Sequence, residues 1–213
     1  MHTRHFRSHL PLAGAIFVAA CAGLAPLVDR QATAPELPGF GVVRMTVTTD
    51  VPAARQWFLQ GMQQAYAFNE REAVRSFKAA LALDPQCAAC AWGVAWQLGP
   101  NINAVERGDL GEAARYALLA QSVAGHATPL ERALIEAMVV RYADAGSAPI
   151  TALLQGAICS SGGGTGKAHP LDIAYALQLR MIADAHPEDP DAVSLYAEAE
   201  MVATHDDWWD PKT

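Results

Sequence analysis

Basic residues are scarce in this chain of 213 residues, which carries 15 Lys and Arg against 22 Asp and Glu. The first twenty residues hold two of the arginines and no acidic residue, so the remainder has a net charge of 13 − 22 = −9. Nucleic-acid binding needs a basic face, and this balance argues against nucleic acid as a partner. A surface with this excess of acid is compatible with a soluble protein whose copies repel one another.

A hydrophobic run long enough to span a bilayer is also lacking near the N-terminus. Residues 10–20 form an apolar run of eleven residues, preceded by Arg4 and Arg7. A positive start followed by a short apolar run is typical of a secretory signal peptide, not of a membrane span. The sequence therefore predicts export, with residues 1–21 as the signal segment.

The apolar run ends in Val18-Ala19-Ala20-Cys21, which resembles the bacterial lipobox. On this interpretation Cys21 is lipidated and anchors a periplasmic lipoprotein, and the lipid is the protein's only contact with the membrane. Ordinary cleavage after Ala22 or Ala25 would instead leave a soluble periplasmic protein. A third interpretation keeps the segment as an uncleaved buried helix. Residues 22–51, with prolines and glycines up to Gly41, predict a tether or extended arm.

Sequence motifs for catalysis and for cofactors are missing. No Ser-His-Asp or Cys-His arrangement stands out. The glycine-rich segment that ends at Lys167 is no phosphate loop, because Ser161 occupies the first glycine position and Ala168 replaces the required hydroxyl. We expect a protein without enzymatic activity, cofactor or metal, and we interpret residues 160–166 as a linker.

Cys87 and Cys90 form a C-x-x-C pair. A haem attachment site would need a histidine at residue 91, which is Ala, and a zinc site would need a second pair of ligands. A thioredoxin-like site would need a preceding strand, whereas a predicted helix precedes this pair. We interpret Cys87 and Cys90 as a structural pair and candidate disulfide, with redox and metal roles as the alternatives.

A regular pattern is present between residues 57 and 85. Its positions have spacings of 4, 12, 4, 3 and 5, and they are Trp57, Gly61, Ala73, Phe77, Ala80 and Pro85. This register resembles the 34-residue tetratricopeptide repeat (TPR), a pair of antiparallel helices, although Gln stands at two consensus positions, 60 and 64. The small residues at 61 and 73 allow close helix approach, and Pro85 ends the second helix.

Further helices are predicted along the rest of the chain. The first pair covers 52–68 and 70–83, and the next helix covers 88–98. Asp109 and Glu112 resemble a capping box that opens a helix to about residue 125, and Thr128 caps a helix that reaches Ala145-Gly146. Later helices are expected at 149–157, 170–185 and 190–203. The sequence thus predicts an all-α fold of TPR-like antiparallel helix hairpins stacked as a right-handed superhelical array over 52–204, with 205–213 unstructured or truncated.

Several motifs together resemble a family of exported bacterial TPR proteins. These motifs occupy residues 77–85, 87–103, 128–137 and 187–199. Members of that family are longer, which implies that this chain is truncated at its C-terminus. The glycine-rich segment 162–166 departs from the family pattern.

In a TPR array the first helices of successive units line a concave groove, and this predicts the residues that bind a partner. Trp92 and Trp96 are four residues apart and share one helix face. The alternative is that both indoles are buried by a neighbouring helix, and that the asparagines at 101 and 103 bond only to their own loop. The predicted partner-binding residues are Arg55, Phe58, Met62, Tyr66, Trp92, Trp96, Asn101 and Asn103.

The sequence therefore predicts a non-catalytic scaffold of the bacterial cell envelope that binds a protein or a peptide. The rival interpretation is the N-terminal helical part of a larger enzyme, thiol-redox or metal-handling protein. A purely structural segment of an envelope protein is the third.

Overall fold

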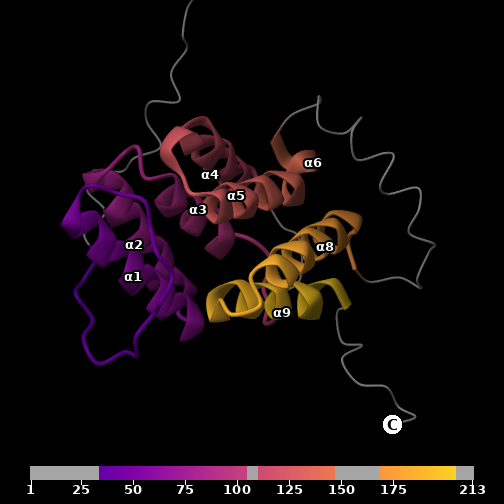
Figure 1. Ribbon diagram of the computed structural model, residues 1–213, viewed down its shortest axis with the longest axis horizontal. Coiled ribbons are helices and arrows are strands. Elements are labelled where there is room, and N and C mark those ends of the chain that lie inside the picture. Colours follow the sequence, from indigo (N-terminus) through magenta and orange to yellow (C-terminus); the bar gives the residue numbers. More distant parts are fainter. Residues whose placement is uncertain (1–33, 105–109, 147–167, 205–213) are drawn as a thin grey trace, which may run out of the picture.

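The computed structural model describes residues 34–104, 110–146 and 168–204, and the regular structure within these ranges is helical (Figure 1). Consecutive helices pack in pairs, α1 with α2, α3 with α4, and α8 with α9, while α5 lies against α3, α4 and α8. Among the described residues, no helix has the length and the apolar character needed to cross a membrane. The helices are α1 (Pro52–Tyr66), α2 (Glu70–Leu83), α3 (Ala88–Gln97), α4 (Gly111–Ser122), a short 3₁₀ turn (Ala124–His126), α5 (Pro129–Arg141), α6 (Ala143–Gly146), α8 (Pro170–Ala185) and α9 (Pro190–Thr204).

The all-α prediction and the sequential pairing of helices are confirmed. The predicted caps are confirmed at two helices. Thr128 and Glu131 form a reciprocal capping box at the start of α5, and Asp189 accepts hydrogen bonds from the first amides of α9. The signal segment with Cys21, the capping residue Asp109, the helix expected at 149–157, the segment 162–166 and the end 205–213 all lie outside the described residues.

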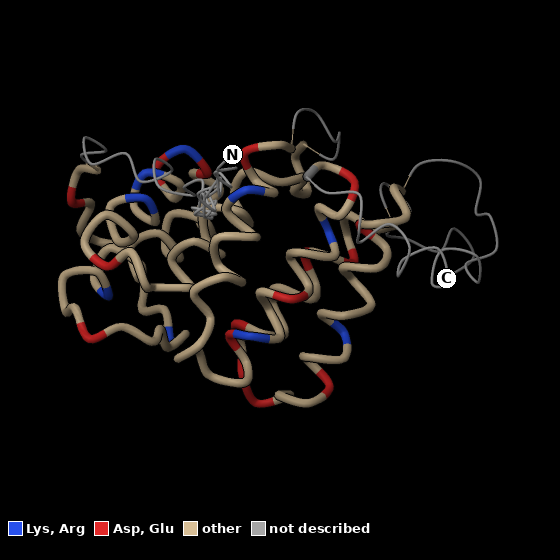
Figure 2. Tube along the Cα trace, turned by 90° about the horizontal axis from the view of Figure 1, so that it is seen from above, with Lys and Arg blue, Asp and Glu red and all other residues tan. Residues whose placement is uncertain are grey.

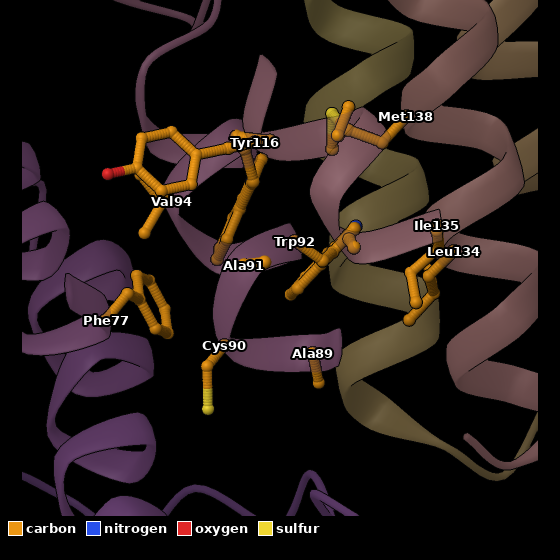
Figure 3. Close-up of a cluster of buried hydrophobic side chains, with 14 of the residues drawn as sticks. Phe77, Ala89, Cys90, Ala91, Trp92, Val94, Tyr116, Leu134, Ile135 and Met138 are labelled. Atoms are coloured by element: carbon orange, nitrogen blue, oxygen red, sulfur yellow. The ribbon is translucent and has the colours of Figure 1, made fainter. Parts of the chain in front are cut away.

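The ring of Phe77 on α2 fills the space between two glycines. A Cβ atom added to Gly61 of α1 would lie 2.6 Å from the ring, and one added to Gly93 of α3 would also lie 2.6 Å away. The prediction of close approach at Gly61 thus has a specific cause, since an aromatic side chain occupies the room that the missing Cβ leaves. One ring joins three successive helices. Figure 3 shows Phe77 on one side of α3 and Leu134 and Ile135 of α5 on the other, beyond Trp92.

The later part of the expected tether packs on the helices. Met45, Val47 and Thr49 are buried in alternation, as in an extended strand with one covered face. The backbone amide and hydroxyl of Thr48 donate to the two carboxylate oxygens of Glu131, at 2.7 and 2.6 Å. Glu131 therefore caps α5 and holds the arm at the same time.

A buried ion pair joins α8 to the earlier helices. Arg141, 1% exposed, donates from Nε to Asp172 Oδ1 at 2.9 Å and from Nη2 to the carbonyl of Pro100 at 2.7 Å. Its guanidinium also lies 4.5 Å from the ring centre of Tyr175. The hydroxyl of Tyr142 donates to the carbonyl of Ala95 at 2.8 Å. These contacts fix the α8–α9 pair against α3 and α5.

Candidate binding cavity at the ends of α1, α3 and α9

A cavity of about 260 Å³ lies where the C-terminal ends of α1 and α3 meet α9. The segments that form it are far apart in sequence, and the α8–α9 pair lies beside the ends of the N-terminal helices in Figure 1. Most of the lining is apolar or aromatic. The lining residues are Ala65, Tyr66, Phe68, Glu70, Trp96, Gln97, Asn101, Ile102, Ser194, Ala197, Glu198 and Met201.

Three aromatic rings follow one another from the core to the cavity wall. Trp92 stacks on Trp96 with ring centres 5.4 Å apart, and Trp96 meets the ring of Tyr66 edge-on at 6.1 Å. The Tyr66 hydroxyl donates to Asp191 Oδ1 on α9 at 2.7 Å. Burial raises the pKa of Tyr66, and the neighbouring Asp191 raises it further, so the phenol stays protonated. This hydrogen bond fixes the wall of the cavity across two distant helices.

Glu198 brings a partly buried carboxylate to the same wall. The indole Nε1 of Trp96 donates to Glu198 Oε2 at 2.8 Å. Burial raises the pKa of Glu198; the positive charge of Arg141 and the hydrogen bond from Trp96 oppose this, while Glu70 adds to it. Gln97 also carries a buried Oε1 that accepts no hydrogen bond from any described residue. The polar lining is thus rich in acceptors.

Phe68 stands at the cavity in a strained backbone conformation. Its φ of +56° is the one positive value for a non-glycine among the described residues. The backbone amide of Phe68 donates to the carbonyl of Ala65, and the backbone amide of Asn69 donates to the carbonyl of Gln64. This is the hydrogen-bond pattern of a Schellman motif at a helix C-terminus. Glycine usually occupies this position, because a side chain there costs free energy. Here a phenylalanine occupies it, and this residue is 57% exposed at the cavity.

A second cavity of about 260 Å³ adjoins the first across Tyr66. It lies between the N-terminal arm and α1, and Tyr66 is the residue that lines both cavities. The side-chain Nε2 of Gln63 donates to the carbonyl of Gly41 at 2.7 Å and holds the arm there. The lining consists mainly of apolar side chains and backbone: Phe40, Gly41, Val42, Val43, Gln63, Tyr66 and Ala67.

The structure brings three of the predicted partner-binding residues to the main cavity: Tyr66, Trp96 and Asn101. The side-chain oxygen of Asn101 accepts from the amides of residues 103 and 104, so it satisfies its own loop there. Asn103 is exposed in that loop.

The other predicted residues lie elsewhere. Phe58 and Met62 are completely buried and Trp92 is 1% exposed, so these side chains belong to the core and are not available to a partner. The alternative given for the tryptophans, burial by neighbouring helices, describes both, since Trp96 is 4% exposed although it also lines the cavity. Arg55 is exposed at the start of α1, where it donates to the carbonyl of Thr49 at 2.8 Å.

Cys87 and Cys90 are joined by a disulfide, and both residues are completely buried. The Cys87 sulfur also accepts from the amide of Cys90 at the start of α3. Thiol exchange needs an accessible sulfur, and burial denies that access. Within the described ranges, no group of three or more His, Cys, Asp or Glu is placed to hold a metal ion.

Sequence reasoning missed Phe68, Glu70 and Glu198. Glu198 is 102 residues from its partner Trp96, a pairing that no local pattern reveals. Phe68 did leave a signal, since the junction between two predicted helices held Phe-Asn where a helix end usually has glycine.

Comparison with protein-family models, with curated proteins and with solved structures found no match to this chain. The resemblance to exported TPR proteins therefore stays a prediction. The geometry of the two cavities is what supports a functional proposal.

Proposed function

We propose that this chain is a non-catalytic helical scaffold that binds a segment of another polypeptide across Tyr66. The observation that supports it is the pair of adjoining cavities that share this one aromatic side chain. A segment that crosses Tyr66 can place one side chain in each cavity. Exposed aromatic side chains beside well-formed pockets are common anchors for peptides.

We also propose that the helix pairs are TPR-like units. The support is the register from Trp57 to Pro85 together with the packing of Phe77 between Gly61 and Gly93. In a TPR array the first helix of each unit faces the ligand. The first two such helices would be α1 and α3, and the ends of both contribute to the main cavity.

The test is selection from a displayed library of random peptides against the whole chain. Wild-type protein should enrich peptides, and these should bind Phe68→Ala at least about tenfold more weakly, because loss of an exposed aromatic anchor typically has an effect of this size. Leu177→Ala on α8 is the matched control, since Leu177 is 56% exposed and lines neither cavity. Enriched peptides that bind both variants equally well would place the binding surface elsewhere.

Export to the cell envelope is part of the same proposal. Its support is the sequence of residues 1–21 alone, with Cys21 as the lipidated residue. Labelled palmitate should enter the wild-type protein in a bacterial host and should fail to enter Cys21→Ser. Labelling that survives the substitution would refute the lipid anchor.

A further inference from the structure

The polar groups of the main cavity favour one kind of ligand. Glu198 and Glu70 bring carboxylates from α9 and α2, and the Oε1 atom of Gln97 is a buried acceptor without a donor among the described residues. None of the described residues that line the cavity is Lys or Arg. A ligand with a positive charge and N–H donors would satisfy these groups, whereas an anion would be repelled by both carboxylates.

The aromatic wall favours the same kind of ligand. The indole of Trp96 and the ring of Tyr66 line the cavity beside Glu198. The face of an aromatic ring attracts a cation. Tyr66, 38% exposed, is the accessible ring, whereas Trp96 is 4% exposed and stacks on Trp92. A carboxylate next to such rings adds charge-assisted hydrogen bonding to this attraction.

We infer that the cavity at Trp96 and Glu198 takes the ammonium or guanidinium group of a lysine or arginine side chain, and this inference rests on the proposed binding of a polypeptide. The volume of about 260 Å³ lies just below the range of pockets for drug-sized ligands and suits one side chain. The adjoining cavity at Phe40 and Val42 then takes an apolar side chain of the same segment.

The charge preference has to arise in the cavity itself. Figure 2 shows acidic positions spread over the helices and interspersed with Lys and Arg. A spread of this kind steers cations weakly and without specificity. In the free protein, burial and Glu70 raise the pKa of Glu198, and a bound cation would offset both influences.

The experiment combines the peptide selection with a charge-deleting variant. Peptides enriched on wild type should carry Lys or Arg at one recurring position. Replacing that residue with norleucine, which keeps the carbon chain and removes the charge, should weaken binding at least about tenfold in fluorescence anisotropy.

The double variant Glu70→Gln/Glu198→Gln keeps an acceptor for the Trp96 indole and removes both charges. It should lose at least about tenfold in affinity for the basic peptide and bind the norleucine peptide as wild type does. Glu200→Gln on α9 is the control, because it removes an exposed charge outside the cavity lining.

The outcomes separate this inference from the proposed function. Enriched peptides that depend on Phe68 but carry no basic residue would overturn the charge preference and leave peptide binding intact. Failure to enrich any peptide would overturn the proposed function and this inference with it. If n-butylammonium alone then shifts the Trp96 indole resonance, the cavity is a site for free amines and not for a polypeptide.

Discussion

Phe68 combines an unfavourable backbone conformation with an exposed ring. A side chain in the left-handed region costs about 1–2 kcal/mol, and exposure of the ring forgoes the gain from burial. Stability alone therefore does not account for phenylalanine at this helix end. Strained residues of this kind are found preferentially at functional sites.

We expect Phe68→Gly to stabilise the protein by about 1 kcal/mol, because glycine adopts the required φ without steric cost. The free energy of unfolding would be measured by urea denaturation. Phe68→Ala is the matched variant, since it removes the ring and keeps a Cβ in the strained conformation. Both variants should lose peptide binding, but only the glycine variant should gain stability. A glycine variant less stable than the alanine variant would contradict the strain assigned to this position.

The raised pKa of Glu198 predicts a pH dependence of stability. The unfolded-state pKa of Glu is about 4.3. A carboxyl whose pKa is higher than this in the folded state stabilises the protein, and this stabilisation is complete at pH values below the unfolded-state pKa. That contribution is lost as the pH rises through the folded pKa. The charged groups that act on Glu198 are Glu70 from α2 and Arg141 from α5, together with the hydrogen bond from Trp96.

We therefore expect Glu198→Gln to gain stability relative to wild type as the pH rises from about 4 to 7, since the amide does not ionise. Urea denaturation of both proteins across this range would measure the difference. Glu200→Gln, which removes an exposed carboxylate from the same helix, is the control for the loss of a charge. A difference that shrinks as the pH rises would contradict the assigned direction of the pKa shift.

At the scale of helices, Phe77 decides how α1, α2 and α3 pack. We expect Gly61→Ala to destabilise the protein by about 1–2 kcal/mol, because overpacking outweighs the gain of about 1 kcal/mol in helix propensity. The ring cannot retreat from the new methyl group, since Gly93 confines it on the other side. Gly125→Ala is the control, as no atom lies within 4 Å of the added Cβ there. Recovery of stability in Gly61→Ala/Phe77→Leu would assign the loss to this contact.

The ion pair between Arg141 and Asp172 governs the attachment of α8 and α9. We expect Arg141→Leu to cost about 3–5 kcal/mol, because it leaves the Asp172 carboxylate buried without its cation. Hydrogen exchange should show amides of α8 and α9 losing protection ahead of those in α1 to α3. The double variant Arg141→Leu/Asp172→Leu should recover part of the loss. Equal loss of protection in all helices would mean that the helix pairs unfold as one unit.

Helix positions followed from the sequence more readily than helix contacts did. Two predicted helices, 70–83 and 170–185, have the observed bounds, since caps and prolines act within a few residues of each helix end. The packing of Trp92 could not be assigned, because burial depends on α5, some forty residues further along. The first helix was predicted to end at Phe68, two residues after the observed end of α1 at Tyr66. The difference arises because the Schellman turn follows the last helical residue.

At the scale of the whole molecule, the N-terminal arm extends the core beyond its helices. We expect a chain that begins at residue 52 to be at least about 3 kcal/mol less stable than one that begins at residue 34, because Met45 and Val47 lose their burial. The loss also leaves Glu131 without its contacts to Thr48. Urea denaturation of the two chains would test this, and a difference below about 1 kcal/mol would show that the arm is dispensable.

The sequence predicted a tether for residues 22–51, and composition supports that interpretation up to Gly41. Beyond it, Met45, Val47 and Thr49 are buried in alternation, and the arm bonds to Glu131 of α5 and to Asp84 at the end of α2, which are distant in sequence. The candidate cavity is unpredictable for the same reason. Its wall joins Tyr66 to Asp191, a separation of 125 residues.

The sequence separation between Tyr66 and Asp191 determines the order in which the parts of the cavity are synthesised. Synthesis proceeds from the N-terminus at roughly 5–20 residues per second, so α1, α2 and α3 exist for several seconds before α9 has been made. During that interval the aromatic wall has no Glu198 and no Asp191, and the cavity does not exist. A nascent chain can therefore fold its first helices without capturing a basic segment of its own sequence or of a neighbouring chain. Competence for the proposed binding arises only when α9 docks.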